Sequence, residues 1–99
     1  MTLPSEFRPF FWDTDFDGLD TRRHCNFIII RLYCKGDMEG IRWVHMNYTD
    51  AEVRHAACVR RDMNPIVANY LMKKYALNRE EMRYYTYNGD AWRNALRNT

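Results

Sequence analysis

The most apolar run in the chain is His24-Cys25-Asn26-Phe27-Ile28-Ile29-Ile30-Arg31-Leu32-Tyr33-Cys34. At 3.6 residues per turn its side chains fall into two apolar stripes, namely Cys25, Ile28, Ile29, Leu32 and Tyr33 on one side and Phe27, Ile30 and Cys34 on the other. A helix with two apolar sides must be enclosed by other elements, so the run predicts a central buried helix over residues 21–35. A buried strand is the alternative, but the length and the flanking caps favour a helix.

The flanks of this run carry helix start and stop signals. Asp20 can cap the first free N–H groups, and Gly36 stands where a left-handed stop residue is expected. Before it, residues 1–12 combine five large apolar side chains with two prolines, which predicts an extended aromatic arm lying across the helices.

Further helices are predicted after Gly36. Asp37 can cap a helix from Met38 to about Asn47, and Thr49 with Glu52 forms a capping box that opens a helix to residue 61. Asn64 followed by Pro65 starts a helix to about residue 77, with Val67, Tyr70 and Leu71 facing inward. A short helix follows to about residue 84, residues 85–87 read as extended, residues 88–89 as a turn, and residues 90–96 as one or two last helical turns.

The predicted fold is therefore all-α, a small bundle of four to five short helices around a central buried helix. Ninety-nine residues make one domain, divided into an arm and turn over residues 1–20, a helical core over 21–77 and a C-terminal extension over 78–99. Three cysteines without C-x-x-C spacing suggest reduced core residues rather than disulfides. With neither a signal peptide nor a long apolar run, the expected location is cytoplasmic.

Charge is distributed unevenly along the chain. Residues 1–20 carry five acids and one arginine, net −4, whereas residues 21–99 have net charge +6. Twelve of the fifteen basic residues are arginines, which suit bidentate contacts with phosphate or carboxylate. The basic body is compatible with nucleic acid, with an acidic protein partner, or with ordinary solvation of helix faces.

The segment Asp13-x-Asp15-x-Asp17-Gly18 matches the first half of an EF-hand calcium loop. The second half does not match, because the twelfth position, which needs a bidentate Glu, is His24. We therefore expect Asp13 and Asp15 to be solvated or paired with arginine, and Asp17 and Asp20 to bond turn and helix-start N–H groups.

Catalytic and metal-binding motifs are not apparent. The histidines and cysteines lack zinc-ligand spacing, and His24 and Cys25 point about a hundred degrees apart on a helix, which excludes a thiolate–imidazole pair. No P-loop, G-x-S-x-G or G-x-G-x-x-G motif occurs. We expect no cofactor, no metal and no enzymatic activity.

The two predicted helices over 49–61 and 65–77, joined by Asp62-Met63-Asn64, have helix-turn-helix proportions. In that interpretation polar side chains of the second helix reach bases while basic residues hold phosphates. The candidate DNA-binding or partner-binding residues are Arg54, Arg60, Arg61, Asn64, Asn69, Lys73 and Lys74. The alternative is a solvated basic face.

Aromatic residues gather near the C-terminus in greater number than a small core can enclose. Tyr and Trp dominate the energetics of protein contacts, so this region is a candidate protein-binding or self-association surface. Its predicted interface residues are Tyr84, Tyr85, Tyr87 and Trp92. The alternative is a satellite aromatic cluster that closes one end of the bundle.

Several of these features occur together in a known pattern. The segments concerned are Trp12-Asp13-x-Asp15-Phe16-x-x-Leu19-Asp20, Phe27-Ile28-Ile29-x-Arg31-Leu32, Gly36-Asp37, Ile41-Arg42-Trp43, Tyr48, Arg60-Arg61 and Asn69-Tyr70. Over about residues 7–72 they resemble a small bacterial domain family of unknown function. Its members are similar to antitoxin-like proteins often encoded beside nucleotidyltransferase toxins, and no catalytic residues are assigned to them.

The resemblance implies a helical, non-enzymatic regulatory module that binds a partner protein, DNA, or both through the basic helical pair. The alternative function is a structural or assembly domain that binds protein through its Tyr- and Trp-rich C-terminal surface and has no role with nucleic acid. Neither the identity of the partner nor the oligomeric state follows from the sequence.

Overall fold

The computed structural model describes residues 3–86 and contains helices but no strand within that range. Its elements in chain order are η1 (Ser5–Phe11), η2 (Phe16–Gly18), α1 (Cys25–Lys35), α2 (Met38–Asn47), α3 (Asp50–Val59), α4 (Pro65–Lys74) and η3 (Arg79–Glu81), where η denotes a 3₁₀-helix. Residues 83–86 are also helical. The predicted all-α fold is confirmed. None of the described helices has both the length and the apolar composition that crossing a bilayer requires.

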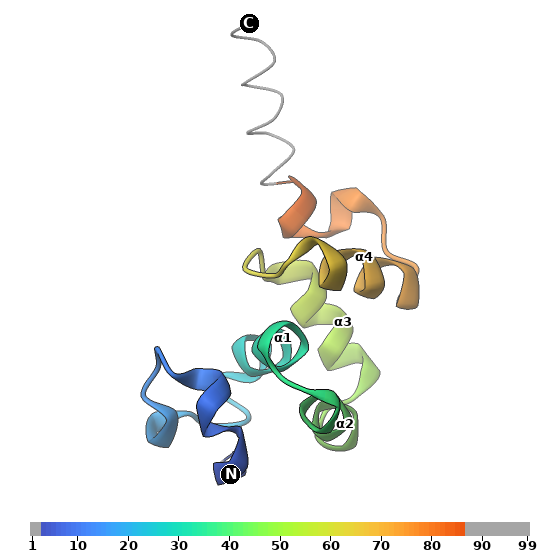
Figure 1. Ribbon diagram of the computed structural model, residues 1–99. Coiled ribbons are helices and arrows are strands. Elements are labelled where there is room, and N and C mark those ends of the chain that lie inside the picture. The colour runs from blue at the N-terminus through green and yellow to red at the C-terminus, as the bar shows by residue number, and fades with distance from the viewer. Residues whose placement is uncertain (1–2, 87–99) are drawn as a thin grey trace, which may run out of the picture.

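Helix α1 is the centre of the bundle (Figure 1). Ile28, Ile29, Ile30 and Leu32 are fully or almost fully buried, and the helix packs against α2, α3 and η1. Because three consecutive residues of a helix point in directions about 100° apart, burial of all three isoleucines requires neighbours on more than one side. The prediction from the two apolar stripes is therefore correct.

The start of α1 lies at Cys25, later than the predicted residue 21. Residues 21–24 form a turn instead, and the Asp20 carboxylate accepts a hydrogen bond from the Arg23 backbone N–H at 2.7 Å. The Asp20 backbone N–H donates to Nδ1 of His24 at 3.0 Å. Asp20 thus caps the turn that leads into the helix rather than α1 itself.

At the other end of α1, Gly36 does not adopt the left-handed conformation that the sequence suggested. Its backbone is extended, with φ −82° and ψ 176°. A Cβ atom at this position would lie 2.5 Å from the carbonyl oxygen of Leu32. Glycine is required here because the chain turns back closely over the last turn of α1, not because of a positive φ.

The predicted caps of the next three helices are confirmed. The Asp37 carboxylate accepts from the N–H of Gly40 at 3.0 Å, and the Asn64 side chain accepts from the N–H of Val67 at 2.8 Å. In the capping box of α3 the Thr49 hydroxyl accepts from Glu52 N–H at 3.1 Å and the Glu52 carboxylate accepts from Thr49 N–H at 3.0 Å. Helices α3 and α4 end two to three residues earlier than predicted.

The N-terminal arm packs on α1 as expected, but it is not extended. It forms the 3₁₀-helix η1, which buries Phe7 and Phe11. The Phe11 ring lies 5.9 Å from that of Phe27 in α1, and the Phe7 ring lies 5.9 Å from that of Trp43 in α2, both in edge-on geometry. Pro9 lies inside η1, and the φ angle that its ring imposes matches that of a 3₁₀ turn.

The three cysteines are unpaired and partly buried. Burial raises the pKa of the Cys34 and Cys58 thiols above its usual range. Both thiols therefore stay protonated at neutral pH, in keeping with their predicted role as small core residues.

The chain after α4 differs from the prediction. Tyr85 and Thr86, predicted as extended, belong to a helical segment in which both backbone N–H groups donate to the carbonyl of Met82 at 3.1 Å. Met82 is fully buried and anchors this segment to the core. Tyr87, the turn at residues 88–89 and the predicted last turns, with Trp92, lie outside the described residues.

Helix α4 ends in a left-handed residue that is not glycine. Ala76 has φ 51°, and the N–H groups of Ala76 and Leu77 donate to the carbonyls of Lys73 and Met72 at 3.4 and 2.9 Å. This is the Schellman arrangement, in which glycine is the preferred residue at the left-handed position.

Ala76→Gly is therefore expected to raise the free energy of unfolding by about 0.5 to 1 kcal/mol, because it removes the Cβ strain at positive φ. Urea unfolding followed by circular dichroism measures the change. The matched control is Ala51→Gly at an exposed position in the first turn of α3, where the same substitution relieves no strain and should destabilise by up to about 0.5 kcal/mol. Destabilisation at both sites would contradict the prediction.

Candidate partner-binding surface on α4

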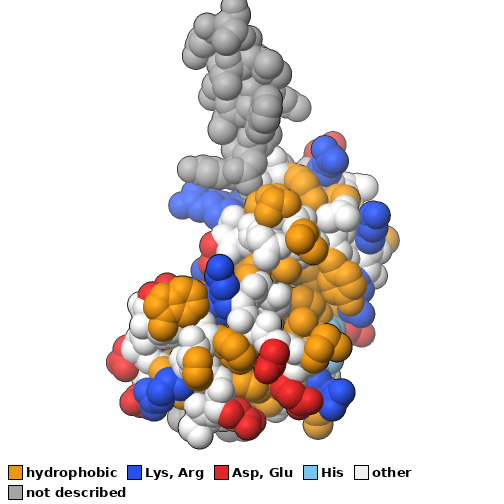
Figure 2. Space-filling view, viewed as in Figure 1, with side chains coloured by type: hydrophobic (Ala, Val, Ile, Leu, Met, Phe, Trp, Pro, Cys, Tyr) orange, Lys and Arg blue, Asp and Glu red, His pale blue; other side chains and the backbone are white. Residues whose placement is uncertain are grey.

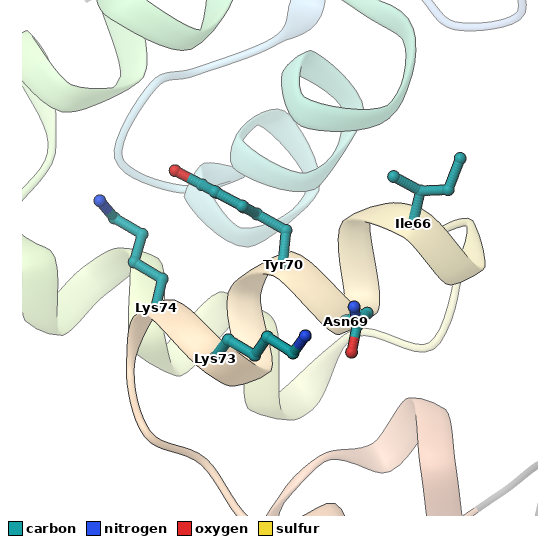
Figure 3. A pocket seen from close by; sticks show the side chains of 5 residues that line it. All are labelled: Ile66, Asn69, Tyr70, Lys73 and Lys74. Carbon is teal, nitrogen blue, oxygen red and sulfur yellow. The ribbon is translucent and has the colours of Figure 1, made fainter.

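The outer face of α4 carries the most exposed large apolar residue of the described chain. Helix α4 buries Val67, Ala68 and Leu71 against the bundle. On the opposite side Ile66 is 82% exposed and Tyr70 is 49% exposed. These two residues line a shallow hollow together with Asn69, Lys73 and Lys74 (Figure 3). We call these five residues the α4 face.

Two of the α4-face residues hold each other in position. The Lys74 ammonium lies 6.0 Å from the centre of the Tyr70 ring and 5.8 Å from that of Tyr75. The negative face of an aromatic ring attracts a cation at such distances. Ile66 and Tyr70 project from the same edge of α4 (Figure 3), as their four-residue spacing requires. The face therefore combines an apolar ridge with a positive border.

The prediction that Tyr70 faces inward is wrong. Its ring packs against that of Tyr33 in α1, with 6.1 Å between the ring centres, but about half of the Tyr70 surface is exposed to solvent. Ile66 is not predicted from the sequence as a surface residue of interest, because Val67 and Leu71 already account for the inward face of the helix. The signal was present in the spacing of Ile66, Tyr70 and Lys73, which form a stripe opposite Ala68.

Of the seven predicted DNA-binding or partner-binding residues, the structure brings three together on the α4 face: Asn69, Lys73 and Lys74. Arg60 and Arg61 lie apart from them, in a second hollow with Val59, Asp62 and Arg83. The remaining two, Arg54 and Asn64, belong to neither hollow and serve structural contacts, since Arg54 pairs with Glu81 at 3.3 Å and Asn64 caps α4.

Arg60 also forms an ion pair within the chain, with Asp62. Its Nε and Nη2 atoms donate to the two carboxylate oxygens of Asp62 at 2.9 and 2.6 Å, and its guanidinium lies 5.4 Å from the centre of the Phe27 ring. The hydrogen bond raises the pKa of Arg60 and lowers that of Asp62. This arginine is neutralised by its neighbour, which weakens its contribution to phosphate binding.

The connection between α3 and α4 is longer than the helix-turn-helix hypothesis assumed. Helix α3 ends at Val59 and α4 begins at Pro65, so five residues join them instead of three. The turn of a helix-turn-helix motif usually has three or four residues. The pair therefore departs from the proportions that suggested DNA recognition.

The predicted aromatic interface is partly enclosed. Tyr84 and Tyr85 are half-buried against the core, with 5.1 Å between their ring centres, and the Arg79 guanidinium lies 5.2 Å from the Tyr85 ring. This geometry resembles the alternative of a satellite aromatic cluster. Tyr87 and Trp92 lie outside the described residues.

Two of the three aspartates of the half EF-hand motif pair with arginines, Asp13 as expected and Asp17 in place of the turn N–H groups predicted for it. Arg31 donates to both oxygens of Asp13 at 2.7 and 3.1 Å, and Arg8 donates to Asp17 at 2.6 Å. The hydrogen bond from Arg31 lowers the pKa of Asp13 from 3.8 to about 2. Within residues 3–86, no three His, Cys, Asp or Glu side chains lie together in a way that could hold a metal ion.

A second cluster adjoins the α4 face where the helices meet. The Tyr33 hydroxyl and Nε2 of His45, on α1 and α2, form a hydrogen bond, and the Tyr75 hydroxyl donates to Asp50 at the start of α3 at 3.3 Å. Burial raises the pKa of Tyr33 above its usual range, and burial together with Asp50 raises that of Tyr75 to about 12. Both phenols are therefore uncharged at neutral pH.

Comparison with known proteins identifies a family to which the chain is similar. A family described as a family of unknown function (DUF6922) matches residues 6–57, which span η1 to most of α3 and more than half of the chain. Helix α4 and its exposed face lie beyond the matched residues. No curated protein and no solved structure matches the chain. The chain belongs to this family of unknown function, DUF6922.

Proposed function

We propose that the chain is a non-enzymatic interaction module that binds a partner protein through the α4 face. The observation that carries the proposal is the exposure of Ile66, an aliphatic side chain that is 82% accessible on the rim of a hollow. Ile66 and the half-exposed Tyr70 line the same hollow, and Tyr is one of the residues that dominate the energetics of protein contacts. A shallow hollow along a helix also suits a partner segment better than a small substrate.

The resemblance of residues 7–72 to antitoxin-like modules supports a regulatory role and indicates the kind of partner, a nucleotidyltransferase-type toxin. In this arrangement the family-matched part, from η1 to α3, forms the scaffold that positions α4. The face of α4 then determines which partner is bound.

DNA is the second candidate ligand of the same face. Asn69 and Lys73 are exposed on the second helix of the α3–α4 pair, where a recognition helix would present them. Against it, Arg54 and Arg60 are engaged by carboxylates, and the apolar side chain of Ile66 projects from the start of the helix that would have to enter the groove. The geometry favours a protein.

The test uses the tagged chain purified from the cells that encode it, as wild type, Ile66→Glu and Met46→Glu. Met46 is 77% exposed on α2 and provides a matched apolar control. We expect a nucleotidyltransferase-type protein to co-purify with wild type and Met46→Glu, and its purified form to bind Ile66→Glu at least about tenfold more weakly in calorimetry. Equal capture by all three variants would contradict the role of α4.

The DNA candidate is tested separately by fluorescence anisotropy with the promoter region of the chain's own gene. If phosphates are neutralised, affinity falls steeply between about 50 and 200 mM salt. Such a fall, abolished by Lys73→Gln/Lys74→Gln, would favour DNA over the protein partner.

A further inference from the structure

We propose that the docking surface extends beyond α4, across Tyr33 of α1 to Met38 and His45 of α2, and that it receives an acidic amphipathic segment of the partner. This inference rests on the proposed function of the α4 face and adds both the extent of the surface and the chemistry of its occupant.

The two helices are joined by a continuous line of rings. The Tyr33 ring lies 6.1 Å from that of Tyr70 on α4 and 5.8 Å from that of His45 on α2, and the Tyr33 hydroxyl is hydrogen-bonded to the imidazole. Tyr33, the middle ring, is buried, whereas Tyr70 and His45 on either side of it are exposed. An occupant of the α4 face therefore meets a preformed aromatic floor, not open solvent, on the α2 side of Tyr70.

Helical spacing places a second exposed apolar side chain, Met38, on the flank of α2 that carries His45. Met38 precedes His45 by seven residues, which is close to two turns, so the two side chains share one flank of α2. Met38 is 73% exposed. Met46 follows His45 by one residue and points about 100° away, towards the flank of Trp43, so it lies off the surface. Figure 2 shows hydrophobic side chains gathered in a band that runs from the region of α4 towards α2.

The charges around this band decide its occupant. Helix α4 supplies Lys73 and Lys74 and contains no acidic residue. At the α2 end of the band, Asp37 and Glu39 flank Met38, and Glu39 pairs with Arg42 at 3.4 Å, so the charge there is mixed. The band is bordered by positive charge alone at its α4 end, and a partner whose carboxylates lie over Lys73 and Lys74, beside its apolar anchors, complements that end.

A second copy of the chain is the alternative occupant, since Lys73 and Lys74 of one copy would meet Asp37 and Glu39 of the other if α4 packed on the start of α2; the mass by light scattering tests it. The acidic N-terminal segment is a poor substitute, because Asp13 and Asp17 already pair with Arg31 and Arg8. The arrangement that we propose is helix-in-groove recognition. A partner helix packs its apolar residues, spaced three and four apart, on the band, and its acidic residues lie along the edge of the band.

The test uses a fluorescein-labelled synthetic helix of about 18 residues, long enough for about five turns, with Leu on one face and Glu on the other. Matched peptides carry Lys or Gln in place of Glu. Anisotropy is measured with wild type, Lys73→Gln/Lys74→Gln, Met38→Glu and Met46→Glu, each checked for folding by circular dichroism. We expect the Glu peptide to bind wild type and Met46→Glu alike, and the other two variants at least about tenfold more weakly.

Several outcomes would overturn the inference. Equal binding of the Glu and Lys peptides, or of the Glu peptide to all four proteins, would exclude the acidic occupant. A dimer mass by light scattering that Ile66→Glu abolishes would make a second copy the occupant, and salt-sensitive binding of duplex DNA lost with the two lysines would make it nucleic acid. If the cellular partner is lost with Ile66→Glu but retained with Met38→Glu, the proposed function stands and the extension to α2 fails. If both Ile66→Glu and Met38→Glu still bind the cellular partner, the proposed function itself fails.

Discussion

Replacing Ile29 with alanine is expected to lower the free energy of unfolding by about 3 to 4 kcal/mol, a large part of the total stability of a small domain. Ile29 is fully buried in α1, between two other buried isoleucines. The substitution removes three carbon atoms, and the neighbouring elements hold α1 from more than one side. They cannot all move inward to fill the cavity, so both the transfer free energy and the lost packing contribute.

The matched control is Ile66→Ala on α4. The side chain is the same, but it is 82% exposed, so its removal should change stability by less than about 0.5 kcal/mol. Urea denaturation of both variants, with the midpoint and slope fitted to a two-state transition, measures the difference. Similar losses for the two variants would contradict the central position of α1.

The positions of the helices were predictable because their signals are local. The two stripes of the Ile-rich run, the Thr49–Glu52 capping box and the Asn64–Pro65 start each depend on residues within about two turns. A cap of this kind needs only a side-chain acceptor and the N–H three residues later, so it can be predicted without knowing what surrounds the helix. The burial of the isoleucines confirms the stripes, and single hydrogen bonds confirm the two caps.

The predictions that the structure contradicts depend on contacts between segments distant in the sequence or on close approaches of the backbone. The preference of glycine for positive φ predicts a left-handed stop at Gly36, whereas the actual constraint there is the nearby Leu32 carbonyl. Two prolines disfavour an α-helix and so predict an extended arm, but a 3₁₀-helix tolerates Pro9 and lets Phe7 and Phe11 reach the core. Backbone preferences alone do not tell which of several permitted conformations packs best.

The candidate site was predictable only in part for the same reason. Lys73 and Lys74 follow from the helical spacing of α4, but the neutralisation of Arg54 by Glu81 joins residues 27 positions apart. Likewise the sequence does not show that Tyr33 bridges Tyr70 and His45. Extending the surface from α4 to α2 required the tertiary structure.

Arg31→Ala is expected to lower the free energy of unfolding by about 2 to 3 kcal/mol and to release the N-terminal segment from α1. The Arg31 side chain is only 15% exposed. It donates to the Phe10 carbonyl at 3.2 Å and to both oxygens of Asp13, and its guanidinium lies 5.0 to 5.8 Å from the centres of three aromatic rings, those of Phe11, Trp12 and Phe27. These contacts join η1 and the turn after it to α1 through a single side chain.

The pH dependence of stability gives this prediction a second readout. The pKa of Asp13 is lowered from 3.8 to about 2 in the folded state, chiefly by the hydrogen bond from Arg31. The ion pair therefore stabilises the folded chain above about pH 4, and its contribution is lost as the pH falls towards 2. The stability difference between wild type and Arg31→Ala should shrink over that range, while the contributions of other carboxylates cancel in the comparison.

Arg42→Ala is the matched control, because Arg42 is exposed and makes a single ion pair with Glu39 at 3.4 Å, within one helix. Its loss should cost less than about 0.5 kcal/mol at any pH. Arg31→Lys keeps the positive charge but loses the two-pronged contact with Asp13, so it should recover less than half of the lost stability. Hydrogen exchange locates the effect, since release of η1 predicts faster exchange of the amides in residues 5–20 than in α3. Uniform acceleration across the chain would instead show that Arg31 supports the core as a whole and does not specifically hold the N-terminal segment.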